Sequence, residues 1–183
     1  NALGASTTGC RNIAIGDTAL GGADTTGLNN IAMGTLAMDA LTSGGCNIAI
    51  GPSALGGMTV GNMNIAIGDN AMSGVTTGTT PTYNIAMGQN ALLGSASTTG
   101  THNFAVGLSS LAAITTGIEN IAIGCANSDA LTSGKWNVAL GSKAYGAATT
   151  GCSNIAIGLA ALGCADTTGI NNIAIGQTAM DVL

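Results

Sequence analysis

The chain contains little charge and few aromatic side chains. Charged residues make up 6% of its 183 residues, and Phe, Trp and Tyr together make up 2%, whereas a typical soluble domain has about 25% charged residues. Its only basic residues are Arg11, Lys135 and Lys143, and the formal net charge is −5. Because nucleic acids and anionic membranes are bound through stripes of Lys and Arg, we expect no nucleic-acid partner and no anionic membrane surface as a partner.

Long hydrophobic runs and clusters of reactive side chains are lacking as well. No apolar stretch approaches the roughly 18 residues of a membrane-spanning helix, so we expect no membrane insertion. The single histidine, His102, and five scattered cysteines do not make a metal-ligand set, so we expect no metal and no cofactor. We expect His102 to lie at a surface turn and the cysteines to be small, buried or half-buried apolar residues. Without a Ser/His/Asp set or a pair of carboxylates we expect no enzyme activity.

The chain consists instead of one motif, present in ten copies. The motif reads N-I-A-I-G, with Met, Val, Leu or Phe in place of an Ile in some copies, and the copies follow one another at intervals of 17 to 20 residues. Periods this short are typical of solenoids, in which each repeat forms one coil. Residues 1–183 are therefore interpreted as a single repeat array, which we expect to be a segment of a longer protein. The motif begins at Asn12, Asn30, Asn47, Asn64, Asn84, Asn103, Asn120, Asn137, Asn154 and Asn172.

Each repeat is interpreted as one coil of β-structure. The alternation in N-I-A-I-G has period two, which is typical of a strand. A short Ala-Leu segment follows, and a T-T-G segment turns the chain back. Two glycines in every repeat argue against a helix. The predicted fold class is all-β: a parallel β-solenoid or β-roll of about ten coils of 17–20 residues, stacked about 4.8 Å apart.

Stacking places like residues above like. Asn over Asn predicts a ladder of side-chain amides, and the two Ile residues of each motif are predicted to fill the coil interior. The Ala between them is Ala in every copy, whereas a face exposed to water should drift toward polar residues. We expect a close contact there, with the opposite wall of the coil or with another chain, and we favour several chains packed through it. This candidate assembly face comprises Ala14, Ala32, Ala49, Ala66, Ala86, Ala105, Ala122, Ala139, Ala156 and Ala174.

Two further features are candidate binding surfaces. The T-T column is predicted to form hydroxyl bonds along the stack, and the alternative is a flat Thr array that binds ice. The aromatic residues Tyr83, Trp136 and Tyr145 are expected at bends of the coil, where a sugar ring could stack on them. The interpretation as incidental surface residues stays open for all three.

The repeat N-I-A-I-G…A-L…T-T-G resembles the YadA-like head repeats of trimeric autotransporter adhesins, whose motif reads N-S-V-A-I-G. It is also similar to the N-T-A-I-G…A-L…T-T-G repeats of phage tail fibres. The adhesin unit is shorter, and its Asn lies one residue further from A-I-G. The resemblance spans the whole chain and implies a β-roll within a homotrimeric fibre, extracellular, on a cell surface or on a virion.

We therefore expect a structural fibre or adhesin segment that presents a receptor-binding tip. A second copy and a third copy of the chain are the expected partners, together with a cell-surface glycan or receptor. The alternative is a monomeric ligand-binding β-solenoid, such as an ice-binding protein that uses the Thr-Thr column.

Overall fold

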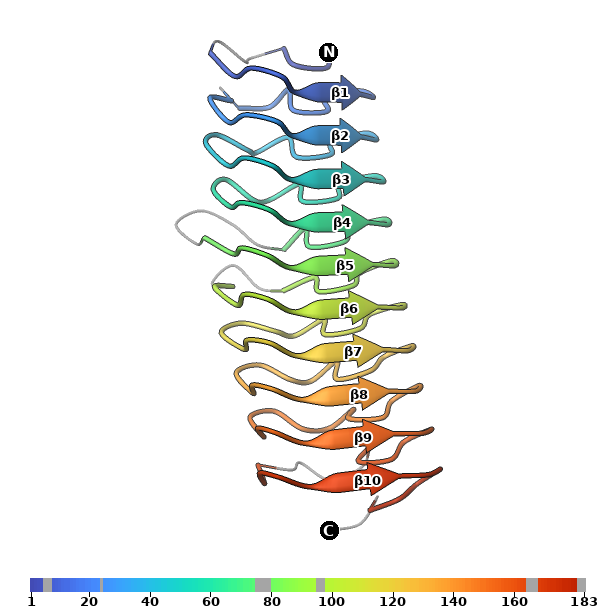
Figure 1. Ribbon diagram of the computed structural model, residues 1–183. Coiled ribbons are helices and arrows are strands. Elements are labelled where there is room, and N and C mark those ends of the chain that lie inside the picture. Colours follow the sequence, from blue (N-terminus) through green and yellow to red (C-terminus); the bar gives the residue numbers. More distant parts are fainter. Residues whose placement is uncertain (5–7, 24, 75–79, 95–97, 164–167, 181–183) are drawn as a thin grey trace.

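The structure is a rod of stacked coils with the strands β1 and β10 at its two ends (Figure 1). This computed structural model describes residues 1–183 except 5–7, 24, 75–79, 95–97, 164–167 and 181–183. Each coil contributes one strand of three residues. The strands are β1 (Ile13–Ile15), β2 (Ile31–Met33), β3 (Ile48–Ile50), β4 (Ile65–Ile67), β5 (Ile85–Met87), β6 (Phe104–Val106), β7 (Ile121–Ile123), β8 (Val138–Leu140), β9 (Ile155–Ile157) and β10 (Ile173–Ile175). The predicted all-β parallel solenoid of about ten coils is confirmed.

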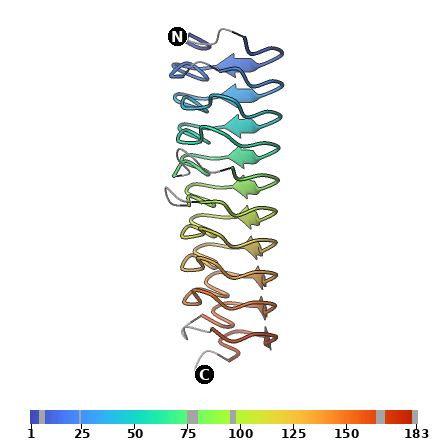
Figure 2. The ribbon, with the colours of Figure 1, turned by 90° about the vertical axis from the view of Figure 1, so that its left-hand side faces the viewer.

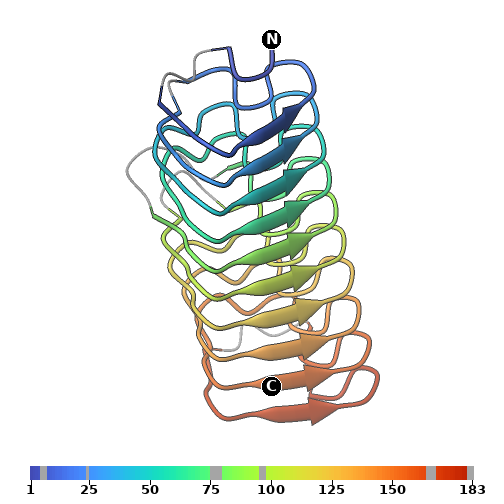
Figure 3. The same ribbon diagram turned by 45° about the horizontal axis from the view of Figure 1, so that its top comes forward.

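The strands pair in chain order within one parallel sheet of ten strands. The register aligns the copies of the motif, so that Ala14 pairs with Ala32 at the start of the sheet and Ala156 pairs with Ala174 at its end. The sheet forms one wall of the rod, and the rest of each coil lies behind it (Figures 2 and 3). Since neighbouring strands lie about 4.8 Å apart, the ten strands span about 43 Å.

The Ala residues of the motif point into the coil, which corrects the predicted orientation of the strand. Ala32, Ala49, Ala66, Ala86, Ala105 and Ala122 are fully buried within the single chain, Ala139, Ala156 and Ala174 are almost so, and Ala14 in the first coil is half-buried. The flanking Ile residues, predicted to fill the interior, lie outside: Ile15 is 56% exposed and Ile123 is 39% exposed. Of the two contacts expected for the Ala column, the structure shows the one with the opposite wall of the same coil. These ten residues are therefore not an assembly face.

Larger apolar side chains fill the interior from the other half of the coil. Leu20, Leu55 and Leu162, at the position of Leu in the Ala-Leu segment, are fully buried, and Leu41 and Leu131 join them from the segment before T-T-G. The strand side of this narrow interior then has room only for small side chains. This explains why the middle of the strand is Ala in every coil and why Ile faces outward.

The Asn ladder is confirmed. The Asn47 side-chain Nδ2 donates to Asn30 Oδ1 in the preceding coil at 3.1 Å and to the carbonyl oxygen of Gly61 in the following coil at 2.8 Å. The backbone N–H of Asn47 also donates to Asn30 Oδ1 at 2.9 Å. The pattern recurs along the rod, so that the amides of the eight motifs from Asn30 to Asn154 each join three successive coils, and their buried polar atoms are paired within the ladder.

The Gly that ends each motif brings successive coils together. Gly34 has a φ of 138°, and a Cβ on it would lie 2.5 Å from the carbonyl oxygen of Gly51 in the next coil. Any other residue at this position would adopt a strained backbone conformation, and its Cβ would clash with the main chain of the next coil. The same Gly in every coil is therefore a packing requirement of the stack.

Candidate functional site

The outer face of the sheet is an apolar surface that no other part of the described chain covers. The outer columns, defined as the first and third residues of β1 to β10, contain twenty side chains, all of them Ile, Met, Val, Leu or Phe. Every one of these side chains is half-buried or exposed, and Ile13, Ile121, Ile173 and Ile175 are exposed by 40% or more. No charged or polar side chain interrupts either column.

The size of this face can be estimated from the strand geometry. Two columns on one strand face lie about 7 Å apart, and with their side chains they cover a width of about 13 Å. Over a length of about 43 Å this gives roughly 550 Å². Contiguous apolar patches of several hundred Å² on soluble proteins mark contacts with other macromolecules. The period-two alternation of the motif correctly grouped the first and third strand residues on one face. The prediction that this face fills the coil interior was wrong.

The Thr column has mainly a structural role. The hydroxyl of Thr42 donates to the carbonyl oxygen of Thr59 at 2.9 Å, and those of Thr115 and Thr132 make the equivalent bonds at 3.0 Å. The predicted hydroxyl bonds along the stack are therefore present. The second column of T-T is exposed at most described positions, but Ser43, Val60 and Ser133 interrupt it. This arrangement does not favour a flat Thr surface for ice.

The aromatic residues predicted as surface sites have two different positions. Tyr83 and Trp136 are 50% and 53% exposed, whereas Tyr145 is 1% exposed and lies in the core. Tyr145 takes the place of Leu in the Ala-Leu segment, and its hydroxyl accepts a hydrogen bond from Asn154 Nδ2 at 2.8 Å. Its assignment as a surface residue was wrong, because the aligned repeat already places this position in the interior.

Tyr83 and Trp136 belong to the edge column, defined as the residue before each motif Asn. This column holds nine different residue types in ten coils, and all its members except the half-buried Ser153 are exposed. The Tyr83 ring stacks on the ring of His102 in the next coil, with centroids 4.8 Å apart and planes inclined by 16°. His102 is therefore at the surface, as predicted, but it is not isolated. The members are Arg11, Asn29, Cys46, Met63, Tyr83, His102, Glu119, Trp136, Ser153 and Asn171.

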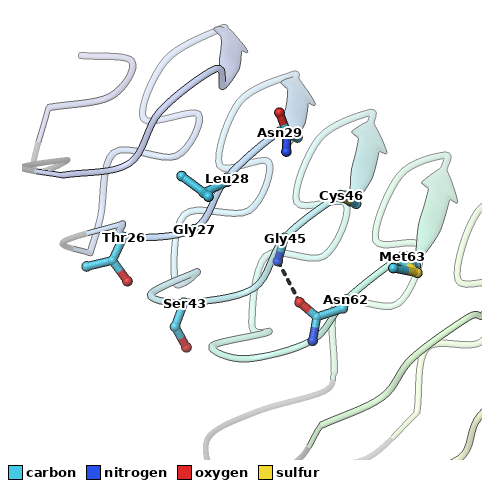
Figure 4. A pocket seen from close by; sticks show the side chains of 9 residues that line it. All are labelled: Thr26, Gly27, Leu28, Asn29, Ser43, Gly45, Cys46, Asn62 and Met63. Atoms are coloured by element: carbon cyan, nitrogen blue, oxygen red, sulfur yellow. Dashed lines mark hydrogen bonds between the residues drawn. The ribbon is translucent and has the colours of Figure 1, made fainter.

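A shallow hollow of about 380 Å³ lies beside the edge column, between the second and fourth coils (Figure 4). It exists because Gly45 has no side chain at the position that Leu28 and Asn62 occupy in the adjacent coils. Asn62 Oδ1 accepts a hydrogen bond from the backbone N–H of Gly45 at 2.9 Å and closes one side. No charged side chain lines it. The full lining is Thr26, Gly27, Leu28, Asn29, Ser43, Gly45, Cys46, Asn62 and Met63.

Groups with catalytic or metal-binding chemistry are dispersed. Among the described residues no three His, Cys, Asp or Glu side chains are placed to share a metal ion. Partial burial raises the pKa of Asp39 above its ordinary value, but among the described residues no hydrogen bond or ion pair joins its side chain to a second carboxyl or base. Cys10, Cys46 and Cys125 are exposed free thiols rather than the buried or half-buried residues expected; Cys152 is half-buried, and Cys164 lies outside the described residues.

Within the described residues, no helix has the length and apolar character needed to span a bilayer. No protein-family model, no curated protein and no solved structure matches the chain.

Proposed function

We propose that this chain is a structural segment of an extracellular fibre or adhesin, in which copies of the rod associate side by side through the outer columns of the sheet. The observation that supports this most directly is the uninterrupted array of twenty outward apolar side chains. Leaving about 550 Å² of apolar surface in water is unfavourable at about 25 cal/mol per Å², so a partner surface of the same kind stabilises the rod.

The regularity of the face makes a second copy of the chain a suitable partner. The outer columns contain no charge, so identical copies can align without placing like charges opposite each other. The spacing of their ridges is set by the same strand repeat in each copy, so the side chains of two aligned copies can interdigitate along the whole length. We propose three copies, the number that the resemblance to trimeric adhesin heads and phage tail fibres implies.

A rod of this kind acts as a spacer. The strands β1 and β10 lie at opposite ends of the rod (Figure 1), so the rod holds groups at its two ends about 43 Å apart. The described carboxylates do not pair with one another, so we infer a structural role without catalysis. A cell surface or a virion is the location that fits such a segment.

We predict that charges on the outer columns will separate the copies without unfolding them. In the double variant Ile121→Glu, Ile123→Glu, both substitutions lie on the outer face of β7, where the native side chains are 40% and 39% exposed. Association would bury two unpaired carboxylates in every copy, so the association constant should fall at least a hundredfold. Light scattering measures the molar mass, and circular dichroism verifies the strand content.

Thr116→Glu provides the matched control, because Thr116 is exposed in the turn that leads into β7 but does not belong to the outer columns. Its molar mass should equal that of the unmodified chain. If the double variant also keeps the unmodified molar mass while it remains folded, the outer columns are not the contact surface.

A further inference from the structure

The aromatic residues of this chain are concentrated in one short section of the rod. The sequence has one Trp, two Tyr, one Phe and one His. Of these five side chains, all except the buried Tyr145 fall in the four consecutive coils that carry β5 to β8. Tyr83, His102 and Trp136 are in the edge column, and Phe104 is in the adjacent outer column. A chain with 2% aromatic residues thus displays nearly all of its rings within four coils.

The backbone places the edge-column side chains of these coils in a line. The φ angles of Tyr83, His102, Glu119 and Trp136 are 59°, 59°, 56° and 58°. Their N–H groups donate to equivalent carbonyl oxygens of the preceding coil at 3.1–3.2 Å. Because the strands that follow them pair in register, successive members are displaced by about 4.8 Å along the rod.

The order of the four side chains leaves an interval between two ring systems. Tyr83 and His102 are stacked on each other with a centroid distance of 4.8 Å, equal to about one coil spacing. Trp136 lies two coils beyond His102, at a backbone interval of about 9.6 Å. A saturated ring in contact with an aromatic face on each side needs about 7–8 Å. Glu119, an exposed carboxylate, occupies the coil between them.

We propose that His102, Glu119 and Trp136, supported by Tyr83, form a binding site for a neutral oligosaccharide. The C–H faces of a pyranose ring pack on imidazole and indole surfaces, and a carboxylate accepts hydrogen bonds from sugar hydroxyls. A nucleic acid would also stack on these rings, but the chain has only three basic residues and a net charge of −5, so it offers no groove for phosphates. The Glu119 carboxylate disfavours an acidic glycan for the same electrostatic reason.

This site goes beyond the proposed fibre role and does not depend on it. The outer columns have the same apolar character in every coil, as a contact repeated along the rod requires. The edge column changes residue type from coil to coil, so a specific recognition surface can form at one level of the rod. Variants in the edge column should therefore leave the association of copies unchanged.

The chain supplies its own reporter, because Trp136 is the only Trp. Its fluorescence is measured while the unmodified chain is titrated with cellotetraose, maltotetraose and tetra-N-acetylchitotetraose at millimolar concentrations. We expect a saturable change in emission with at least one of these neutral tetrasaccharides. His102→Asn should weaken that binding about tenfold, and Tyr83→Asn should weaken it less, because Tyr83 acts by supporting the His102 ring.

Asn is chosen because Asn29 and Asn171 already hold the equivalent position, with φ angles of 58° and 62°. The control is Met63→Asn, in the same column one coil before Tyr83, which should bind as the unmodified chain does. The absence of a saturable change with all three sugars would overturn the proposal, as would binding that His102→Asn leaves intact or that Met63→Asn weakens equally. Light scattering on the same variants keeps this result separate from the fibre proposal, which concerns the association of copies and does not depend on sugar binding.

Discussion

Replacing Ala86 by Glu is expected to unfold the middle of the rod. Ala86 is fully buried and pairs in register with Ala66 and Ala105. The interior has no cation to pair with a carboxylate there, and the longer side chain does not fit between the strand and the opposite wall. The cost of burying an unpaired charge and overpacking the coil is about 4 kcal/mol or more. Circular dichroism during urea unfolding measures both the strand content and the loss of stability.

Met87→Glu is the matched control, because Met87 is the next residue of β5 and is 39% exposed on the outer face. We expect this variant to retain its strand content, although it should associate more weakly. The comparison therefore tests the orientation of the strand. Retention of structure by Ala86→Glu would mean that the Ala column does not lie inside the coil, and equal loss of structure in both variants would mean that Met87 does not lie outside it.

Replacing Asn84 by Ala is expected to have the second-largest effect, because it interrupts the amide ladder. Asn84 Oδ1 accepts from the backbone N–H of Asn103 at 2.9 Å, and Asn84 Nδ2 donates to the carbonyl oxygen of Gly100 at 2.9 Å. The substitution leaves these two buried main-chain groups without partners, at about 1–3 kcal/mol for each. We expect a loss of about 4 kcal/mol in the free energy of unfolding, measured by urea denaturation.

Asn62→Ala provides a comparison within the same residue type. Asn62 is exposed, and its side chain accepts a single hydrogen bond shown in the structure, from Gly45. Its loss should cost less than 1 kcal/mol, since water can replace the bond. If Asn84→Ala proves as mild as Asn62→Ala, the ladder does not stabilise the stack.

Much of the fold could be predicted from the repeat, but the two faces of the strand could not be assigned by hydrophobicity. Period-two alternation groups Ile13 with Ile15 and groups Asn12 with Ala14, without stating which group is inside. The predicted Asn ladder shares a face with the Ala column, since Asn12 and Ala14 are two residues apart, and this ladder is buried in the structure. The interior volume is fixed by Leu20 from the other half of the coil, and only the three-dimensional stack shows how little room remains opposite it.

The candidate surface residues show the same limitation. Tyr83 and Trp136 are exposed as expected, while Tyr145 occupies a core position that the aligned repeat assigns to Leu. His102 appears isolated in the sequence, because its stacking partner Tyr83 is 19 residues away. Because Tyr83 and His102 lie at the same position of adjacent coils, their rings stack with centroids 4.8 Å apart. Column alignment across coils is therefore the signal by which such a site can be recognised in a repeat protein.

The association of copies through the outer columns is the central claim about function. Sedimentation equilibrium of the unmodified chain over a dilution series tests it most directly, because it gives the molar mass without a reporter or a variant. We predict a molar mass three times that of the single chain, maintained on dilution. A folded chain that sediments as a monomer at every concentration would contradict the claim.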